Sequence, residues 1–321
     1  MPSPKLPRMP RPPIPSELRR AVLVEAGHRC AIPQCNHPDV DLHHITPWHQ
    51  CRAHEYRNLI ALCPNCHRRA DRREIDRKSL REYKAKLVAA FAISDSGEFD
   101  FPAVEIKRKI LNKETKGLAA GFDFEFPDFC NSSARIVSRT IESWGRELLS
   151  KYLPATSITA EDASWDDTYI MWVQGRYTVV RYDSLIISLL YEIELYPYRA
   201  AHRSTDVRVQ NFSISPFQPL LLSEILQPET GVIELARVVK SAFGHQHPYL
   251  WSRGEDIPGL APNHENFETF TFDRYGMNFH SQEYQLGGYA IGRPSVCIEY
   301  RSLKGILKDE IYALVTSQDG I

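Results

Sequence analysis

The sequence has no long hydrophobic run and no apolar N-terminal leader. Across its 321 residues, no stretch approaches the roughly 20 consecutive apolar residues that cross a bilayer as a helix. The first fifteen residues are rich in proline and carry Lys5, Arg8 and Arg11, so they do not form the apolar core of a secretory signal peptide. We therefore expect a cytoplasmic protein with no membrane partner.

Cysteine is scarce, and neither sign of charge dominates. The seven cysteines are an odd number, which favours metal ligands and free thiols in a reducing compartment over a framework of disulfides. The net charge is −1, but it is unevenly divided. Residues 1–90 carry 17 Lys and Arg against 9 Asp and Glu, whereas residues 91–321 carry 22 against 31. This division indicates that only the first part of the chain contacts nucleic acid.

Four of the cysteines stand in two close pairs within the basic part. Cys30 and Cys35 form the first pair, and Cys63 and Cys66 form the second. Two such pairs separated by a modest insert have the spacing of a closed tetrahedral zinc site. The zinc ion would be structural, because so small and polar a segment buries little apolar surface. Cys51 is interpreted as a free thiol, with its replacement of Cys35 as a ligand the alternative.

Histidines and an asparagine follow a distinctive order inside this cysteine frame. His43 and His44 are adjacent, Asn58 comes next, and His67 directly follows Cys66. In this order the residues resemble the HNH nuclease family, also called ββα-metal endonucleases. The resemblance implies that His44 is the general base and that His43 and His67 bind a catalytic divalent ion. It also implies that Asn58 bonds to the backbone around the base and fixes that loop.

The helix expected after the second cysteine pair adds further candidate contacts. Asp71 lies four residues after His67, so on a helix the two side chains face the same way, and Asp71 is a candidate third ligand. Mg²⁺ or Mn²⁺ is expected at this site, beside Zn²⁺ at the cysteines. Arg68, Arg69 and Arg72 are expected to contact DNA phosphates, which position a duplex without reading its sequence. Low base specificity is the predicted consequence.

Residues 17–92 are predicted to form one small nuclease domain behind a disordered, proline-rich arm of residues 1–16. Ser16 is expected to cap a helix that ends at Gly27. A strand containing the two adjacent histidines should follow. One continuous helix over residues 64–91 should complete the domain.

A linker over residues 93–120 and a second domain over residues 121–321 are predicted for the rest of the chain. The linker segment is polar and only weakly periodic. The second domain alternates helical spacing with strand-like runs such as TYIMWVQGRYTVVRYD and LIISLLYEIELYP, which predicts one twisted, mainly antiparallel sheet with two helices on it. The fold class is therefore α+β: a small zinc-stapled ββα-metal domain followed by a larger α/β domain.

The second domain contains segments similar to a domain of a lysozyme-sensing bacterial anti-sigma factor and of many envelope proteins. SLLYEIELYPYRAAH and FTFDRYGMNFHSQEYQLGGYAIGRPSVCIEYRSLKGIL carry most of this likeness. In the envelope proteins the domain binds ligands outside the cell, so the resemblance implies a ligand or protein trigger here. The aromatic and glycine-rich segment from Phe270 to Arg293 is the expected binding region. Tyr284, Tyr289 and Tyr300 are expected to pack within the sheet.

Together these features indicate a metal-dependent endonuclease that hydrolyses DNA with low sequence specificity. The second domain is interpreted as a sensor, as in an effector of anti-phage defence, because an unregulated nuclease is toxic to its own cell. The main alternative is a non-enzymatic, zinc-dependent DNA-binding regulator. Another is a restriction-type nuclease whose second domain reads DNA, although the acidity of that domain counts against it. No feature of the sequence indicates an oligomeric state.

Overall fold

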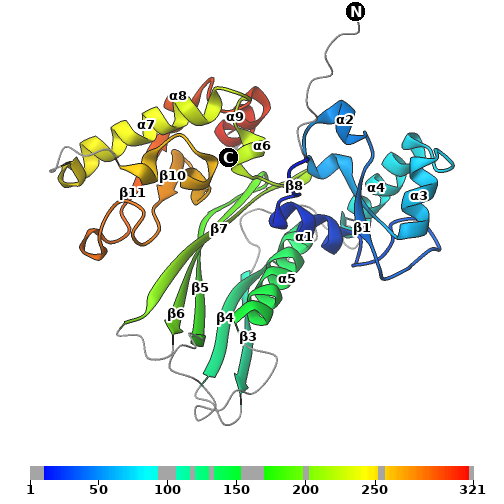
Figure 1. The fold of residues 1–321 in the computed structure, drawn as a ribbon, viewed down its shortest axis with the longest axis horizontal. Coiled ribbons are helices and arrows are strands. Elements are labelled where there is room, and N and C mark those ends of the chain that lie inside the picture. Colours follow the sequence, from blue (N-terminus) through cyan, green and yellow to red (C-terminus); the bar gives the residue numbers. More distant parts are fainter. Residues whose placement is uncertain are drawn as a thin grey trace, which may run out of the picture. The chain divides into compact units, whose positions relative to one another are not determined.

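The computed structural model shows two compact units, Met1–Ser94 and Asp95–Ile321, here called unit 1 and unit 2. The structure describes residues 11–92, 106–115, 120–129, 134–152, 170–197, 202–251 and 257–317 (Figure 1). It confirms the predicted α+β class, with a four-cysteine cluster in unit 1 and a mainly antiparallel sheet in unit 2. Within these described ranges, no helix is long and apolar enough to span a bilayer.

Unit 1 is a short β-hairpin surrounded by helices. Its elements are α1 (Ser16–Glu25), β1 (Asp41–His44), α2 (Trp48–Cys51), the 3₁₀ turn η1 (Tyr56–Asn58), β2 (Leu59–Leu62), α3 (Pro64–Asp71) and α4 (Arg77–Ala92). Strands β1 and β2 pair antiparallel, with His43 opposite Ile60 and His44 opposite Leu59. All four residues of β2 are buried, so this strand is the centre of the unit. The hairpin carries the two adjacent histidines on a buried scaffold.

The first helix begins one residue earlier than the sequence predicts. Pro15 precedes it with φ −52° and ψ 140°, and the Pro15 carbonyl accepts a hydrogen bond from the Arg19 N–H at 2.9 Å. Ser16 is therefore inside the helix, where its hydroxyl donates to the Glu17 carboxylate at 2.9 Å, and the prediction of a Ser16 cap is wrong. The predicted stop is confirmed, because Gly27 has φ +61°, which glycine adopts without a steric penalty.

The single helix predicted over residues 64–91 is two helices. Helix α3 ends at Asp71 and α4 begins at Arg77. Between them, Arg73 has φ +63°, a left-handed conformation that ends the first helix. The Asp76 carboxylate accepts a hydrogen bond from the Ser79 N–H at 2.7 Å and thereby starts the second. The charged sequence of this segment has helix-forming residues throughout, so its composition hides the break.

Unit 2 contains a six-stranded sheet in the order β3-β4-β5-β6-β7-β8. Its elements are β3 (Ile106–Thr115), β4 (Ala120–Phe129), α5 (Arg135–Tyr152), β5 (Ile170–Tyr182), β6 (Ile186–Pro197), β7 (Ser204–Ile214) and β8 (Phe217–Pro219). Strands β4 and β5 pair parallel, and every other neighbouring pair is antiparallel. The predicted linker of residues 93–120 is wrong where β3 forms, whereas residues 93–105 and 116–119 lie outside the described residues.

Strand β3 is polar because it is the edge of this sheet. It pairs only with β4, and Lys109 on β3 forms an ion pair with Asp128 on β4 at 2.6 Å. Charged side chains are common on edge strands, since they discourage pairing with another chain. The polar composition that suggested a linker is therefore compatible with a strand.

Helix α5 packs on the face of β3 and β4 (Figure 1). The Trp144 ring meets the Phe124 and Tyr191 rings edge to face, with centroids 5.3 and 4.7 Å away. Gly175 on β5 leaves room for Phe124, because a Cβ atom there would come within 2.2 Å of the ring. Such aromatic packing gives this end of the sheet a core that needs no bound ion.

The rest of unit 2 forms a second, three-stranded sheet, so the prediction of one sheet is wrong. Its strands are β9 (Phe270–Phe272), β10 (Gly276–His280) and β11 (Ser295–Glu299), in the order β11-β10-β9. Helices and 3₁₀ turns surround it: α6 (Leu222–Ile225), α7 (Gly231–Gln246), η3 (Pro248–Trp251), η4 (Pro258–Leu260), η5 (His264–Phe267), η6 (Tyr289–Ile291), α8 (Tyr300–Leu303) and α9 (Asp309–Thr316). Leu235, Val239 and Phe243 of α7 share a buried cluster with the strands.

Two of the three tyrosines predicted to pack within the sheet do not. Tyr284 and Tyr289 are each 58% exposed, whereas Tyr300 is 6% exposed. The exposed pair lies in the loop between β10 and β11, where Gly287 and Gly292 have positive φ. The glycine-rich segment is therefore a surface loop with aromatic side chains, and only Tyr300 contributes to the core.

Candidate functional site

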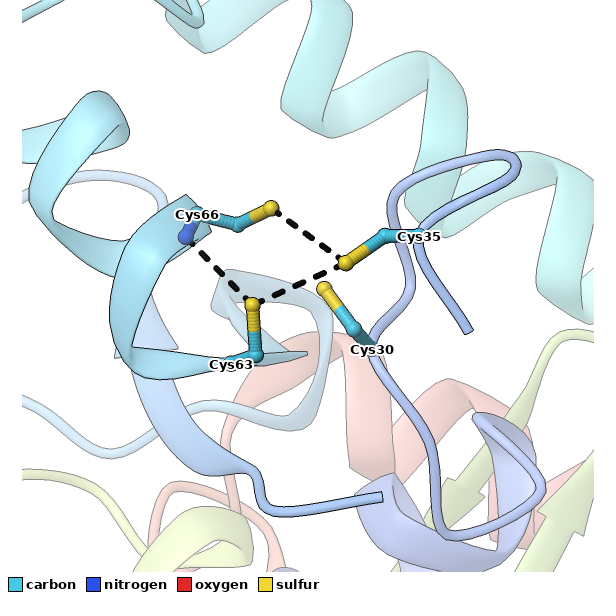
Figure 2. Close-up of side chains that lie close together, drawn as sticks. All are labelled: Cys30, Cys35, Cys63 and Cys66. Carbon is cyan, nitrogen blue, oxygen red and sulfur yellow. Dashed lines mark hydrogen bonds between the residues drawn. The ribbon is translucent and has the colours of Figure 1, made fainter. Parts of the chain in front are cut away.

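The four paired cysteines converge at one point of unit 1 (Figure 2). Their sulfur atoms all lie within 4.8 Å of one another, and Cys35 Sγ lies 3.6 Å from Cys63 Sγ and 3.7 Å from Cys66 Sγ. Four sulfurs about 2.3 Å from a tetrahedral zinc ion would be about 3.8 Å apart. The donor set and these distances therefore fit zinc. Cys51 lies elsewhere, with its sulfur 3.4 Å from the carbonyls of Thr46 and Ala53.

Local structure places each cysteine of the second pair. Strand β2 delivers Cys63 to the residue before α3, and Cys66 follows in the first turn. Burial alone would raise the pKa of Cys63, but the Cys66 N–H and the neighbouring thiols, which donate to its sulfur, lower that pKa to about 7. Burial raises the pKa values of Cys30 and Cys66. A thiolate at Cys63 is the form that binds metal.

A second cluster contains two histidines and an aspartate. His43 Nδ1 lies 3.4 Å from His67 Nε2, and His67 Nδ1 lies 3.1 Å from Asp71 Oδ2. His43 Nδ1 is also 3.8 Å from Asp71 Oδ1. His67 and Asp71 share one face of α3, as their spacing predicts, and His43 reaches them from β1. One donor atom from each residue lies within 4.8 Å of the other two, which is a geometry suited to a divalent ion.

The electrostatics of this cluster keep His43 neutral. Burial, with a smaller contribution from the nearby His67 and Arg11, lowers the pKa of His43 to about 4, while Asp71 opposes the shift. Neutral imidazole is the form that ligates metal. The ring is therefore ready to bind an ion at neutral pH without first losing a proton.

His44, the candidate base, points away from that cluster into a separate set of contacts. The side chain is 5% exposed. Its Nδ1 lies 3.0 Å from Arg11 Nη2, and its Nε2 lies 3.1 Å from His54 Nδ1. Burial lowers the pKa of His44 to about 4, and the positive charge of Arg11 adds to the shift. His44 is therefore neutral and able to accept a proton at pH 7.

Asn58 ties down the chain directly after His44. Its Oδ1 accepts a hydrogen bond from the Thr46 N–H at 2.7 Å, and its Nδ2 donates to the Thr46 carbonyl at 3.0 Å. The Asn58 carbonyl accepts a further bond from the Ile45 N–H at 2.9 Å. These three bonds hold the end of β1, and with it the His44 backbone, in a fixed position.

A buried ionic network connects η1 to two helices. The Tyr56 hydroxyl donates to Glu25 Oε1 at 2.7 Å, and Lys84 Nζ donates to Glu25 Oε2 at 2.5 Å. Burial raises the pKa of Glu25 and lowers that of Lys84, and the attraction between them opposes both shifts. The network joins α1, η1 and α4, so it holds the turn that ends at Asn58.

Three contacts of the candidate base were not found from the sequence. Arg11 and Pro12, in the arm, reach His44 and His54, and Trp48 stacks on His54 with ring centroids 4.6 Å apart. No role was predicted for His54, because a lone histidine in a loop is a weak signal. The one indication of a role for His54 was its position in the loop of a β-hairpin, because such a loop can fold back onto the strand that precedes it. Residues 1–10 of the arm lie outside the described residues.

The predicted phosphate-binding arginines lie beside the cysteine cluster. Arg68, Arg69 and Arg72 are exposed and line a shallow hollow together with Cys35 and Cys66. The residues that line this hollow do not include His43, His67 or Asp71. Ion pairs with Glu74 occupy Arg69 and Arg72, at 3.4 and 4.0 Å. The hollow is therefore separate from the candidate ligand cluster.

Comparison with known proteins gives matches to solved structures and to one family model. Two solved structures resemble the chain: a DUF3298 family member from Bacteroides fragilis, at 17% identity and TM-score 0.44, and one from Pseudomonas aeruginosa, at 14% and 0.44. The first match covers 67% of this chain and 98% of the other, and the second covers 65% and 96%. These matches do not confirm the resemblance to the anti-sigma factor domain. Comparison with curated proteins gives no match.

The model of the HNH endonuclease family matches residues 28–73. That range contains the complete cysteine cluster and every residue of the histidine and aspartate cluster. It also contains His44 and Asn58. Unit 1 therefore carries an HNH-type segment, which is the part of the predicted family resemblance that the comparisons support.

Proposed function

We propose that unit 1 is a metal-dependent endonuclease that hydrolyses phosphodiester bonds in DNA. The observation that carries the proposal is the position of His44, a buried and neutral imidazole, directly after His43 on β1, the strand that brings His43 to His67 and Asp71 of α3. A base beside a divalent ion is the combination that phosphodiester hydrolysis needs. The match of this segment to the HNH endonuclease family supports the same function.

His43, His67 and Asp71 would hold the catalytic ion. When bound, the ion supplies positive charge that stabilises the phosphate and the leaving oxygen. Two imidazole nitrogens and one carboxylate form a mixed donor set. Such a set suits Mn²⁺ better than Mg²⁺, because Mg²⁺ prefers sites made of oxygen atoms alone. The four cysteines would hold Zn²⁺, whose contribution is to fold the segment rather than to react.

His44 acts as the general base. Its neutral ring takes a proton from water, the water oxygen bonds to phosphorus, and the bond from phosphorus to one ester oxygen breaks. That oxygen leaves with the bonding electron pair and takes a proton from solvent water. Asn58 keeps the ring in place through its bonds to Thr46. Arg11 must leave His44 Nδ1 before water can reach that lone pair, and its exposure on the arm allows this movement.

DNA binding relies on charge and not on base contacts. Arg68, Arg69 and Arg72, which line one hollow, would contact phosphates away from the cleaved bond, and contacts of this kind carry no sequence information. Low sequence specificity follows. The proposed DNA substrate and the proposed metal-binding thiols both favour a cytoplasmic location.

Unit 2 is proposed to regulate the nuclease in response to a ligand or protein trigger, as in an anti-phage defence effector. The acidic composition of residues 91–321 argues against a second DNA-binding surface, and the surface loop with Tyr284 and Tyr289 offers exposed aromatic groups. Cleavage by residues 1–95 alone should be faster than cleavage by the full chain. Equal rates under all conditions would remove the basis for regulation.

Plasmid cleavage tests the enzymatic proposal. The full chain should nick or linearise plasmid DNA when Mn²⁺ or Mg²⁺ is added, EDTA should stop the reaction, and His44→Ala should abolish it while leaving DNA binding intact. His49→Ala, which changes an exposed histidine of α2, is the matched control and should cut normally. Equal cutting by wild type and His44→Ala would remove His44 from the mechanism. Tight DNA binding without any cleavage would favour the DNA-binding regulator.

A further inference from the structure

Three hydrogen bonds run in one line through the candidate base. They join Arg11 Nη2 to His44 Nδ1 at 3.0 Å, His44 Nε2 to His54 Nδ1 at 3.1 Å, and His54 Nε2 to the Pro12 carbonyl at 2.9 Å. We propose that His54 is a positioning residue that accepts a hydrogen bond from His44 Nε2–H and so fixes the tautomer and direction of the base. The predicted effect of His54 on DNA cleavage rests on the proposed function, whereas its predicted effect on the His44 tautomer does not.

The two ends of the line determine the direction of every bond in it. An arginine guanidinium can only donate, and a proline carbonyl can only accept. His44 Nδ1 therefore carries a lone pair and accepts from Arg11, and His54 Nε2 carries a proton and donates to Pro12. A neutral imidazole has one N–H, so His44 carries its proton on Nε2 and His54 has its lone pair on Nδ1. The central bond then runs from His44 to His54.

Any other protonation would place two donors face to face. A proton on His44 Nδ1 would meet the Arg11 N–H, and a proton on His54 Nδ1 would meet His44 Nε2–H. Geometry alone therefore leaves one consistent arrangement. Its consequence is that the free lone pair of His44 is on Nδ1, which faces the exposed arm and not the protein interior.

His54 is itself held in place for this role. Its ring stacks on Trp48 with an interplanar angle of 25°, and the Pro12 carbonyl fixes its other nitrogen. The His44 ring meets the same Trp48 edge to face, with centroids 5.8 Å apart. The backbone of Ala53 also forms a hydrogen bond with the His44 ring, which raises the pKa of His44 against the larger effect of burial. The experiment must therefore separate the effect of His54 from that of Ala53.

A pair of isosteric substitutions makes this separation. Leucine and asparagine have nearly the same shape, but only the Oδ1 atom of asparagine can accept the His44 proton where His54 Nδ1 now does. In steady-state DNA cleavage by the full chain with Mn²⁺, His54→Leu should lower kcat by about 10- to 100-fold with KM little changed. His54→Asn should recover most of that loss. An unchanged kcat in His54→Leu would show that Ala53 is sufficient and would overturn the proposal, as would a loss that His54→Asn fails to recover.

Nitrogen NMR of the His44 ring gives a readout that does not depend on activity. Wild type and His54→Asn should show a single Nε2–H tautomer, and His54→Leu should show a mixture. A single Nε2–H tautomer in His54→Leu would also overturn the proposal. If wild type fails to cut DNA with any divalent ion, the proposed function fails, and the NMR result alone then decides the role of His54.

Discussion

The two units of this protein are stabilised in different ways. One buried cluster of unit 1 has nine residues, and three of them are cysteines of the candidate zinc site, Cys30, Cys63 and Cys66. The cluster of unit 2 has 25 buried residues, nearly all aliphatic or aromatic, and no candidate metal cluster occurs among the described residues of that unit. Unit 2 can thus fold by apolar burial, whereas we propose that unit 1 depends on a metal ion at its four cysteines.

Stabilisation by the proposed metal site allows unit 1 to contain buried polar groups that its proposed chemistry requires. His44 is 5% exposed, and the network of Glu25, Tyr56 and Lys84 is also buried, in a unit of fewer than 95 residues. Burying such groups costs free energy that a small apolar core does not supply. The proposed zinc site offsets this cost, because ligation by four thiolates contributes directly to folding.

The largest predicted effect is loss of the cysteine cluster. Cys66→Ser should prevent unit 1 from folding, because the free energy of zinc binding to such sites is on the order of 10 kcal/mol. Calorimetry should show that the transition of unit 2 survives while that of unit 1 disappears. Cys297→Ser, in unit 2, is the matched control and should leave both transitions in place. Two intact transitions in Cys66→Ser would show that unit 1 folds without its metal.

A smaller effect is predicted for the buried ion pair of unit 1. Lys84→Met leaves the Glu25 carboxylate buried without its partner, and should destabilise unit 1 by about 3–5 kcal/mol. Lys86→Met removes an exposed lysine from the same helix and serves as the control. Denaturant unfolding of unit 1 measures both. If the two variants are equally stable, the ion pair does not hold η1 in place.

Unit 2 should respond to acid through His280. Burial lowers the pKa of His280 from 6.5 to about 4, although Glu192 opposes the shift. Between these pH values the unfolded chain binds a proton that the folded chain does not, so stability falls as the pH falls. The loss should be about 2 kcal/mol after allowance for partial burial. His280→Gln should flatten this part of the curve of unfolding free energy against pH, and an unchanged slope would assign the pH dependence to other groups.

The sequence predicted the parts of the site that depend on local spacing. The two cysteine pairs, the adjacent histidines, and the spacing of His67 and Asp71 on a helix are short-range patterns, and the structure brings each set together. The break between α3 and α4 was missed because it depends on the left-handed conformation of Arg73, which an arginine rarely adopts. The β3 strand was missed because its polar residues suit a sheet edge as well as a loop.

The contacts of His44 were beyond the reach of sequence patterns for a different reason. Arg11 is 33 residues from His44, and His54 is ten residues away in an irregular loop. Neither spacing corresponds to a helix or strand period, so only the folded chain reveals the contacts. Within the ligand cluster, only His67 and Asp71 are close in sequence, whereas the approach of His43 and the contacts of the base are set by the tertiary fold.

The central claim is that one ion stabilises the fold of unit 1 and that a second ion is required for DNA cleavage. Metal content and DNA cleavage, measured on both wild type and His67→Ala, test this claim. The account predicts that His67→Ala retains about one zinc ion per chain, binds Mn²⁺ weakly and no longer cleaves plasmid DNA. Cleavage by His67→Ala at the wild-type rate, or loss of the zinc together with the activity, would contradict it.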